Sequence, residues 1–126
     1  MKRMRVIVAG GRDFFQPEHT FLMRKTLDGL LANINNSDIE IVSGKANGAD
    51  RLGEEYANFK GIQLKQFPAE WDRFGKSAGY KRNVQMAEYA NHCVVFWDGS
   101  SKGSKHMIDI AERLGVFTKV INYTKR

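Results

Sequence analysis

The sequence predicts an α/β fold, a single three-layer domain built on a five-stranded, parallel, doubly wound sheet. Apolar strand-like runs alternate with helix-like segments along all 126 residues, as in βαβ units with right-handed crossovers. Three of the runs also end in a glycine-rich turn that opens a helix-like segment, at 6–14, 40–50 and 94–106. We expect the strand order 3-2-1-4-5, with the first and fourth strands flanking a crevice at the carboxyl edge of the sheet.

The five predicted strands are short apolar runs. The first, Arg5 to Ala9, is a continuous, mostly β-branched run, which is typical of a parallel strand buried on both faces. The other predicted strands are residues 39–42, 62–67, 93–97 and 116–122. Their even spacing along the chain leaves room for one helix between most neighbouring pairs.

Four segments have helical spacing, over residues 20–32, 50–60, 81–90 and 105–114. The first fits an amphipathic helix through Phe21, Leu22, Leu27, Leu30 and Leu31. Gly61 and Gly115 follow two of these segments and are expected to stop them. Residues 68–80 contain two glycines and no clear periodicity, so we expect a loop there.

The composition is ordinary for a globular protein, and the charge leaves three interpretations open. Hydrophobic residues make up 42% of the chain and charged residues 27%, and no apolar run approaches the ~20 residues of a membrane span. The net charge of +6 can belong to solvated helix faces, assist an anionic ligand or mark a nucleic-acid surface. Basic residues are mostly interleaved with acids, and are densest at the two chain ends and over 76–82.

Two features of the chain indicate its cellular location. Residues 6–9 are too few for a signal-peptide core, so we expect a cytoplasmic protein. The single Cys93 lies in an apolar run, excludes a disulfide within one chain, and is expected to be a buried small residue.

The three glycine-rich turns predict one composite site for a phosphate-bearing ligand. Such a turn lets backbone N–H groups approach an anion, and the following helix N-terminus adds a favourable dipole. The first turn offers Gly10, Gly11 and Arg12. Alternatively, its glycines only make a tight turn and Arg12 pairs with Asp13. Neither the dinucleotide fingerprint nor a Walker A pattern is present.

The second and third turns supply most of the predicted ligand-binding groups. From SGKANGAD these are Ser43, Gly44, Lys45, Gly48 and Asp50. Asp50 either accepts from a ribose hydroxyl or caps the following helix. From DGSSKGSKH they are Gly99, Ser100, Gly103 and Ser104, which form the strongest of the three predicted anion cradles.

Five ordered motifs resemble the SLOG superfamily, a Rossmann-like group that includes the Lonely-guy phosphoribohydrolases and the DNA-processing protein DprA. The motifs are VAGGRDF, VSGKANGAD, FPAEW, GKSAGYKRNVQM and FWDGSSKGSKHMI. Within the group, the chain is most similar to the YspA/YpsA-related branch of small single-domain proteins. The resemblance implies one nucleotide-binding domain over 1–126 and a nucleotide-derived ligand, with no required cofactor. It also implies a homodimer or larger oligomer, because Lonely-guy relatives self-associate through their helices.

The resemblance implies roles for single residues. RNVQM is similar to the Lonely-guy R-K-x-x-M segment, whose arginine contacts the nucleotide, so Arg82 and its neighbour Asn83 are expected to bind ligand. GSSKGSKHM resembles the phosphate-gripping P-G-G-x-G-T-x-x-E loop, but Met107 stands where the hydrolases have an acid/base glutamate. Methionine cannot move a proton, which leaves Asp98 and Asp50 as candidate catalytic carboxylates. Lys45, where the branch usually has glycine, is expected to contact a phosphate or to point into solvent.

The segment 68–80 and the histidines complete the set of candidate site residues. Trp71 is expected to stack on a nucleobase and Lys76 to meet a phosphate, whereas Phe74 is expected to pack beneath the loop. His19 and His92 have no carboxylate or cysteine at metal-ligand spacing, and His106 stands alone in a helix start, so we expect no metal site.

Three functions are compatible with these residues. We favour a cytosolic binding protein or sensor for a nucleotide or nucleotide-derived metabolite, because Met107 replaces the family acid. The alternative is a phosphoribohydrolase-like enzyme acting on the N-glycosidic bond, with Asp98 or Asp50 as acid/base. The lesser alternative is single-stranded DNA binding as in DprA; nucleic acid is otherwise not an expected partner, and neither is a membrane.

Overall fold

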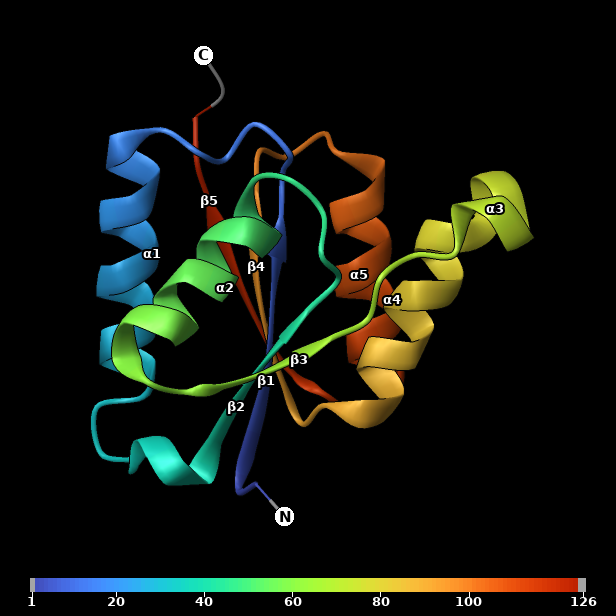
Figure 1. The fold of residues 1–126 in the computed structure, drawn as a ribbon. Helices are drawn as coiled ribbons and strands as arrows, with labels where there is room; N and C mark the ends of the chain where they lie inside the picture. Colours follow the sequence, from blue (N-terminus) through green and yellow to red (C-terminus); the bar gives the residue numbers. More distant parts are fainter. Residues whose placement is uncertain (1, 125–126) are drawn as a thin grey trace.

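The computed structural model describes residues 2–124, which form one parallel sheet of five strands between two layers of helices (Figure 1). The strands are β1 (Met4–Gly10), β2 (Ile39–Ser43), β3 (Gln63–Gln66), β4 (His92–Trp97) and β5 (Phe117–Asn122). The helices are α1 (Pro17–Leu30), α2 (Ala49–Lys60), α3 (Trp71–Phe74), α4 (Ala78–Tyr89) and α5 (Lys102–Arg113). Two 3₁₀ turns, at Asn36–Asp38 and Gly75–Ser77, complete the elements of these residues.

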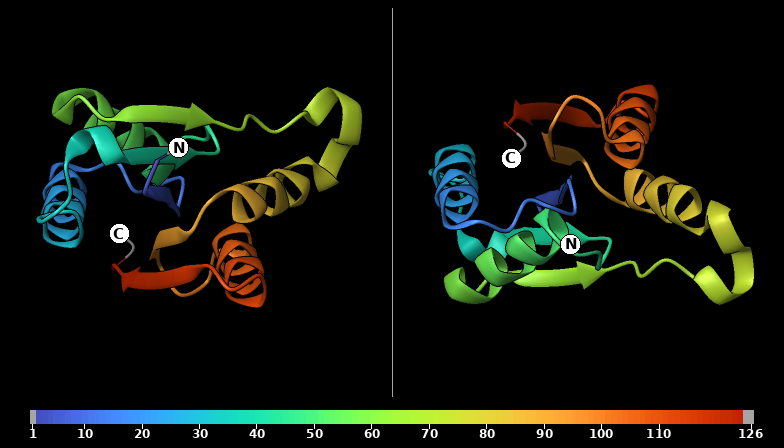
Figure 2. Two further views of the ribbon diagram at one scale, coloured as in Figure 1. Left: turned by 90° about the horizontal axis from the view of Figure 1, so that it is seen from below. Right: turned by 90° about the horizontal axis from the view of Figure 1, so that it is seen from above.

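The sheet has the order β3-β2-β1-β4-β5 with parallel pairing throughout, which confirms the predicted topology. Helices α1 and α2 cover one face, and α4 and α5 cover the other (Figures 1 and 2). This is the predicted α/β, Rossmann-like three-layer architecture. The three glycine-rich turns all follow strands at the carboxyl edge, after β1, β2 and β4.

Two hydrophobic cores, one on each face, explain why the central strands are continuously apolar. Successive side chains of a strand point to opposite faces, so Val6 and Val8 pack under α1 and α2, and Ile7 packs under α4 and α5. Cys93 lies in the second core and is buried as predicted. Burial raises the pKa of its thiol to about 12, so it stays an unreactive packing group.

The first helix differs from the predicted one. It begins at Pro17, three residues before the expected start, because proline suits the first helical position and Gln16 and His19 form a reciprocal capping box. Phe21 is 70% exposed rather than part of the apolar face. The buried position belongs to His19, whose ring stacks on Phe14 at 4.4 Å.

The expected loop over 68–80 is also partly helical. It holds α3, a 3₁₀ turn and the start of α4, which begins at Ala78 rather than Lys81. A four-residue helix is too short to show a hydrophobic period, which is why the sequence pattern missed it. In Figure 1, α3 projects away from the sheet beyond the start of α4.

Two sequence-level observations reach beyond the described residues. Met1, Lys125 and Arg126 lie outside the described residues. The end of the basic C-terminal group and both ends of the predicted domain 1–126 therefore also lie outside them. Among residues 2–124, no helix has the length and apolar character needed to cross a membrane.

Candidate ligand-binding site

A cavity of about 550 Å³ lies at the carboxyl edge of the sheet, between the ends of β1 and β4 and the starts of α4 and α5. The predicted site residues that line it are Gly10, Gly11, Arg12, Asp50, Trp71, Lys76, Arg82, Asn83, Asp98, Ser100, Gly103 and Ser104. Gly44 and Lys45 line a neighbouring cavity of about 330 Å³. Ser43, Gly48 and Gly99 line neither cavity.

Ser43, Gly48 and Gly99 instead shape the turns that surround the two cavities. The Ser43 hydroxyl donates to Glu54 Oε2 at 2.7 Å and accepts from the Lys45 N–H at 3.0 Å. Gly48 has a φ of +80°, and a Cβ there would collide with Gly11 O, so the first two glycine turns pack directly on each other. Gly99, at a φ of +89°, is exposed and makes the turn before α5.

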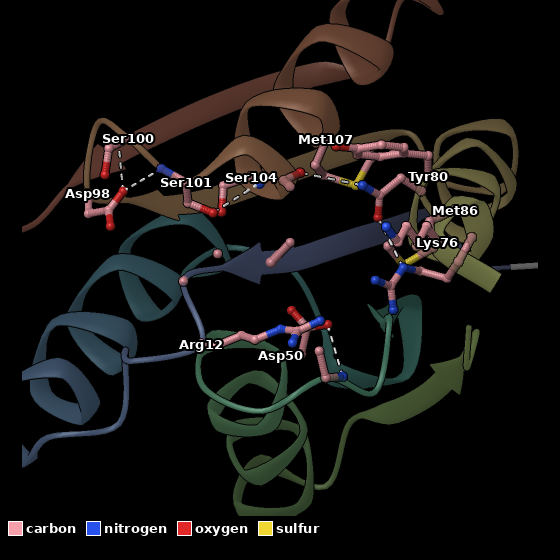
Figure 3. A pocket seen from close by; sticks show the side chains of 18 of the residues that line it. Arg12, Asp50, Lys76, Tyr80, Met86, Asp98, Ser100, Ser101, Ser104 and Met107 are labelled. Atoms are coloured by element: carbon pink, nitrogen blue, oxygen red, sulfur yellow. Dashed lines mark hydrogen bonds between the residues drawn. The ribbon is translucent and has the colours of Figure 1, made fainter. Parts of the chain in front are cut away.

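The start of α5 forms one end of the cavity, as the labelled serines in Figure 3 show. Ser101 is the N-cap, and its side chain accepts from the Ser104 N–H at 3.4 Å. Asp98 Oδ1 accepts from the N–H groups of Ser100 and Ser101, at 2.8 and 2.9 Å. The Asp98 carboxylate therefore shapes this turn.

Ser104 is the residue of this turn with spare hydrogen-bonding capacity. It is 5% exposed and lines the cavity, yet its hydroxyl has no hydrogen-bond partner among residues 2–124. A buried polar atom without a partner costs free energy, and a ligand group bound in the cavity would relieve that cost. Because the free N–H groups and dipole of a helix N-terminus attract anions, an anionic group is the best match.

Asp50 and two arginines occupy the middle of the cavity, and Figure 3 shows Arg12 lying across Asp50. Asp50 is 5% exposed, and its Oδ2 accepts from the Ala46 N–H at 3.2 Å. That donor precedes α2, whose N-cap is Gly48, so this bond is no helix cap. Burial raises the Asp50 pKa to about 6, opposed by the Ala46 hydrogen bond and by the charge of Arg82.

Arg82 connects α4 to the turn after β2. Its Nη1 donates to Gly44 O at 2.5 Å, and its Nε donates to Asn83 Oδ1 at 3.0 Å. A Cβ on Gly44 would lie 2.5 Å from Nη1, so the guanidinium takes the space that glycine leaves free. Burial lowers the Arg82 pKa, and the negative charge of Asp50 opposes that change; an arginine remains charged under such conditions.

The far end of the cavity is aromatic and apolar. Trp71 is 49% exposed and Tyr80 is 45% exposed, and both line the cavity, with Lys76 between them in sequence. Buried Met86 and Met107 also line it, so the residue that replaces the family glutamate is part of the cavity wall. Phe74 lies outside both cavities, with the charged groups of Arg73 and Lys81 within 5 Å of its ring centroid, at 4.8 and 4.9 Å.

The structure adds cavity residues that the sequence argument did not select. These are Ala9, Ala46, Gly79, Tyr80, Met86 and Ser101. Ser101 carried a usable signal, because a serine just before a helix is a preferred N-cap. Tyr80 carried a weak signal as one of three aromatic residues around Lys76. Met86 carried none, since only the packing of α4 places it at the cavity. His106 contacts Tyr80 and Asn83, and no group of three metal-ligating side chains occurs within 2–124.

Comparison with known proteins identifies a family, a phage relative and a solved structure of similar fold. The model of the YspA, cpYpsA-related SLOG family matches residues 4–74. The Gene 61 protein of Mycobacterium phage D29 is 33% identical over 91 residues, which cover 66% of this chain and 70% of the phage protein. The solved structure of DNA processing protein A (DprA) from Streptococcus pneumoniae matches with a TM-score of 0.74 at 18% identity, covering 94% of this chain. At that identity the likeness is one of fold, and the chain spans 50% of the length of that structure.

Proposed function

The chain belongs to the YspA, cpYpsA-related SLOG family, and two arginines and the N-terminus of a helix line its main cavity. We therefore propose that it binds a nucleotide or nucleotide-derived ligand. The family and the fold support a role related to nucleotides or to DNA processing. The residues that line the cavity support a small anionic ligand within that range. The cavity volume of about 550 Å³ lies within the range of small-molecule sites.

One observation carries the proposal: the buried, unpartnered Ser104 hydroxyl stands at the start of α5, inside the cavity. A phosphate placed there would accept from this hydroxyl and from free backbone N–H groups of the helix. Arg12 and Arg82 line the same cavity. The planar guanidinium group of arginine can donate two parallel hydrogen bonds to phosphate oxygens.

The opposite end of the cavity suits a nucleobase. The rings of Trp71 and Tyr80 are about half exposed there, and an aromatic ring offers a stacking face to any base. In the proposed pose, the phosphate lies against the serines and the base lies toward Tyr80 and Trp71. Figure 3 shows Ser100 and Tyr80 at opposite sides of the view.

A hydrolase of the phosphoribohydrolase type is the second candidate, and Asp50 is the observation that favours it. A carboxyl group whose pKa is raised to about 6 by burial is close to the range that serves a general acid at neutral pH. Asp98 is the weaker candidate, because its Oδ1 already accepts two backbone N–H groups. Catalysis would therefore require Asp50 to replace the glutamate that Met107 lacks.

The test is calorimetric titration of the protein with nucleoside 5′-monophosphates, paired with chromatography for released base. We expect saturable binding in the titration. Bound ligand should also raise the free energy of unfolding, by about 2.7 kcal/mol at a ligand concentration of one hundred times Kd. Ser104→Ala and Arg82→Gln should weaken binding by about tenfold. Arg113→Gln, which removes the same charge from the other end of α5, is the matched control and should bind like the wild type.

The outcomes separate the candidates. Binding without base release supports the binding protein. Sustained base release that Asp50→Asn abolishes supports the hydrolase. If no nucleotide binds, while a single-stranded oligonucleotide binds with a steep dependence on salt, the DNA-binding alternative replaces both. The expected homo-oligomer stays a prediction, and sedimentation of the same sample checks it.

A further inference from the structure

A second cavity, of about 330 Å³, adjoins the main one across shared residues. Arg12, Ala46, Trp71 and Arg82 line both cavities. The second cavity adds Gly44, Lys45 and Asn47 from the turn after β2, and Pro68 and Ala69 from the segment after β3. The two cavities therefore form one site with two lobes, and the two arginines stand at the boundary between them.

The lobes differ in charge. The main cavity is lined by Arg12, Lys76 and Arg82, and also by the carboxyl groups of Asp50 and Asp98. The second cavity has the same number of cationic side chains, with Lys45 in place of Lys76, and no acidic residue among those that line it. The second lobe is therefore the more electropositive of the two, because no carboxylate lines it to repel an anion.

The backbone of Lys45 supports a role for this side chain at the lobe. Lys45 has a φ of +61°, and within 2–124 every other residue in that region of φ is a glycine. A lysine in the left-handed conformation costs free energy that a glycine would not. Strained backbone positions of this kind cluster at ligand-binding sites, and here the strained residue is an exposed lysine that lines the lobe with no acid.

We infer that the second cavity is a subsite for a further phosphate group, so that the protein prefers a nucleotide with two phosphates over a monophosphate. This inference rests on the proposed function. The first phosphate lies at the start of α5, and the second contacts Lys45 with Arg12 or Arg82. Two kinds of compound share this chemistry: a 5′-diphosphate, and a nucleotide with phosphates on both sides of its ribose.

The experiment compares 5′-AMP, ADP and adenosine 3′,5′-bisphosphate by calorimetry at low salt, with the guanosine, cytidine and uridine counterparts. We expect at least one compound with two phosphates to bind the wild type about tenfold or more tightly than its monophosphate. Whether the 5′-diphosphate or the 3′,5′-bisphosphate gains identifies the geometry. Raising the ionic strength should reduce the gain, because the second lobe is open to solvent screening.

Lys45→Asn tests the assignment to this lobe, since asparagine tolerates a positive φ, and Lys45→Gly provides a second variant that adopts it freely. Both should lose most of the gain, by about three- to tenfold, and should lower the affinity for a monophosphate by less than that. Lys25→Gln, an exposed lysine on α1 that lines neither cavity, is the matched control.

Each result has one meaning. Equal affinity for one and two phosphates overturns the inference and leaves the proposed function standing. A full gain that persists in both Lys45 variants overturns the assignment of the second phosphate to this cavity. Absence of binding by every nucleotide overturns the inference together with the proposed function.

Discussion

Asp50 gives a quantitative prediction, because a buried carboxyl group with a raised pKa lowers the stability of the folded protein when it ionises. Its side chain is 5% exposed, and burial raises its pKa from 3.8 to about 6. At about 1.4 kcal/mol per pKa unit, this rise corresponds to about 3 kcal/mol. Asp50→Asn removes the charge and keeps an oxygen that can accept from the Ala46 N–H.

The sign of the pH dependence follows from where the proton is bound. Below pH 3.8, Asp50 is protonated in both the folded and the unfolded chain, so it has no net effect. Between about pH 4 and 6 only the folded protein holds the proton, and stability falls as the pH rises. Above pH 6 the loss is complete. We therefore expect Asp50→Asn to match the wild type near pH 4 and to be more stable by about 3 kcal/mol at pH 7.

The assay is urea unfolding at pH 4, 5, 6 and 7, followed by circular dichroism. The difference between the two proteins isolates Asp50, because other carboxyl groups titrate equally in both. Asp109→Asn, at an exposed residue of α5, is the control and should shift little at any of these pH values. If Arg12 and Arg82 instead hold Asp50 ionised, its removal takes a carboxylate away from exposed Arg12 and half-buried Arg82, and Asp50→Asn will be less stable than the wild type at pH 7. That result would refute the reasoning.

Two glycines give further predictions, with a third as control. Gly53→Ala should lower the unfolding free energy by about 1–3 kcal/mol, because the new Cβ would lie 2.8 and 2.9 Å from side-chain atoms of Val8; unfolding in urea measures this. Gly29→Ala is in a helix with nothing within 4 Å of the new Cβ, so it should raise the unfolding free energy by up to about 1 kcal/mol. Equal effects of Gly53→Ala and Gly29→Ala would contradict the packing argument. Gly44→Ala should leave stability within about 1 kcal/mol of the wild type and weaken nucleotide binding in calorimetry, because its Cβ displaces the guanidinium of Arg82, the far end of a long side chain. Unchanged affinity would show that the position of Arg82 is not needed.

The strands and their order were accessible from the sequence because their signals are local. A strand buried on both faces must be apolar at every position, and residues 6–9 and 93–96 meet that condition. Helix stops were equally accessible: Gly61 and Gly115 follow α2 and α5 with φ values of +70° and +78°. Given alternating strands and helices, the handedness of crossovers leaves few topologies.

The residues that the sequence misplaced depend on contacts between distant segments. Phe21 fits the period of an amphipathic helix, yet His19 takes the buried place because Phe14, from the preceding turn, stacks on it. The glycine-rich turns are similar in sequence but have different roles in the folded protein. The turn before α5 lines the cavity, whereas Gly48 serves close packing of one turn on another.

The chain's own pattern of apolar runs, glycines and family motifs established the three-layer architecture, the sheet edge that carries the site and most of the residues near it. The packing of α4 against the sheet decided the rest, because it sends Arg82 across to Gly44 and so divides the space into two lobes with different charge. Asp50 is buried at the start of α2. The pKa of Asp50 and the separation of Lys45 from Lys76 are consequences of distances between segments far apart in the chain, and no local pattern encodes them.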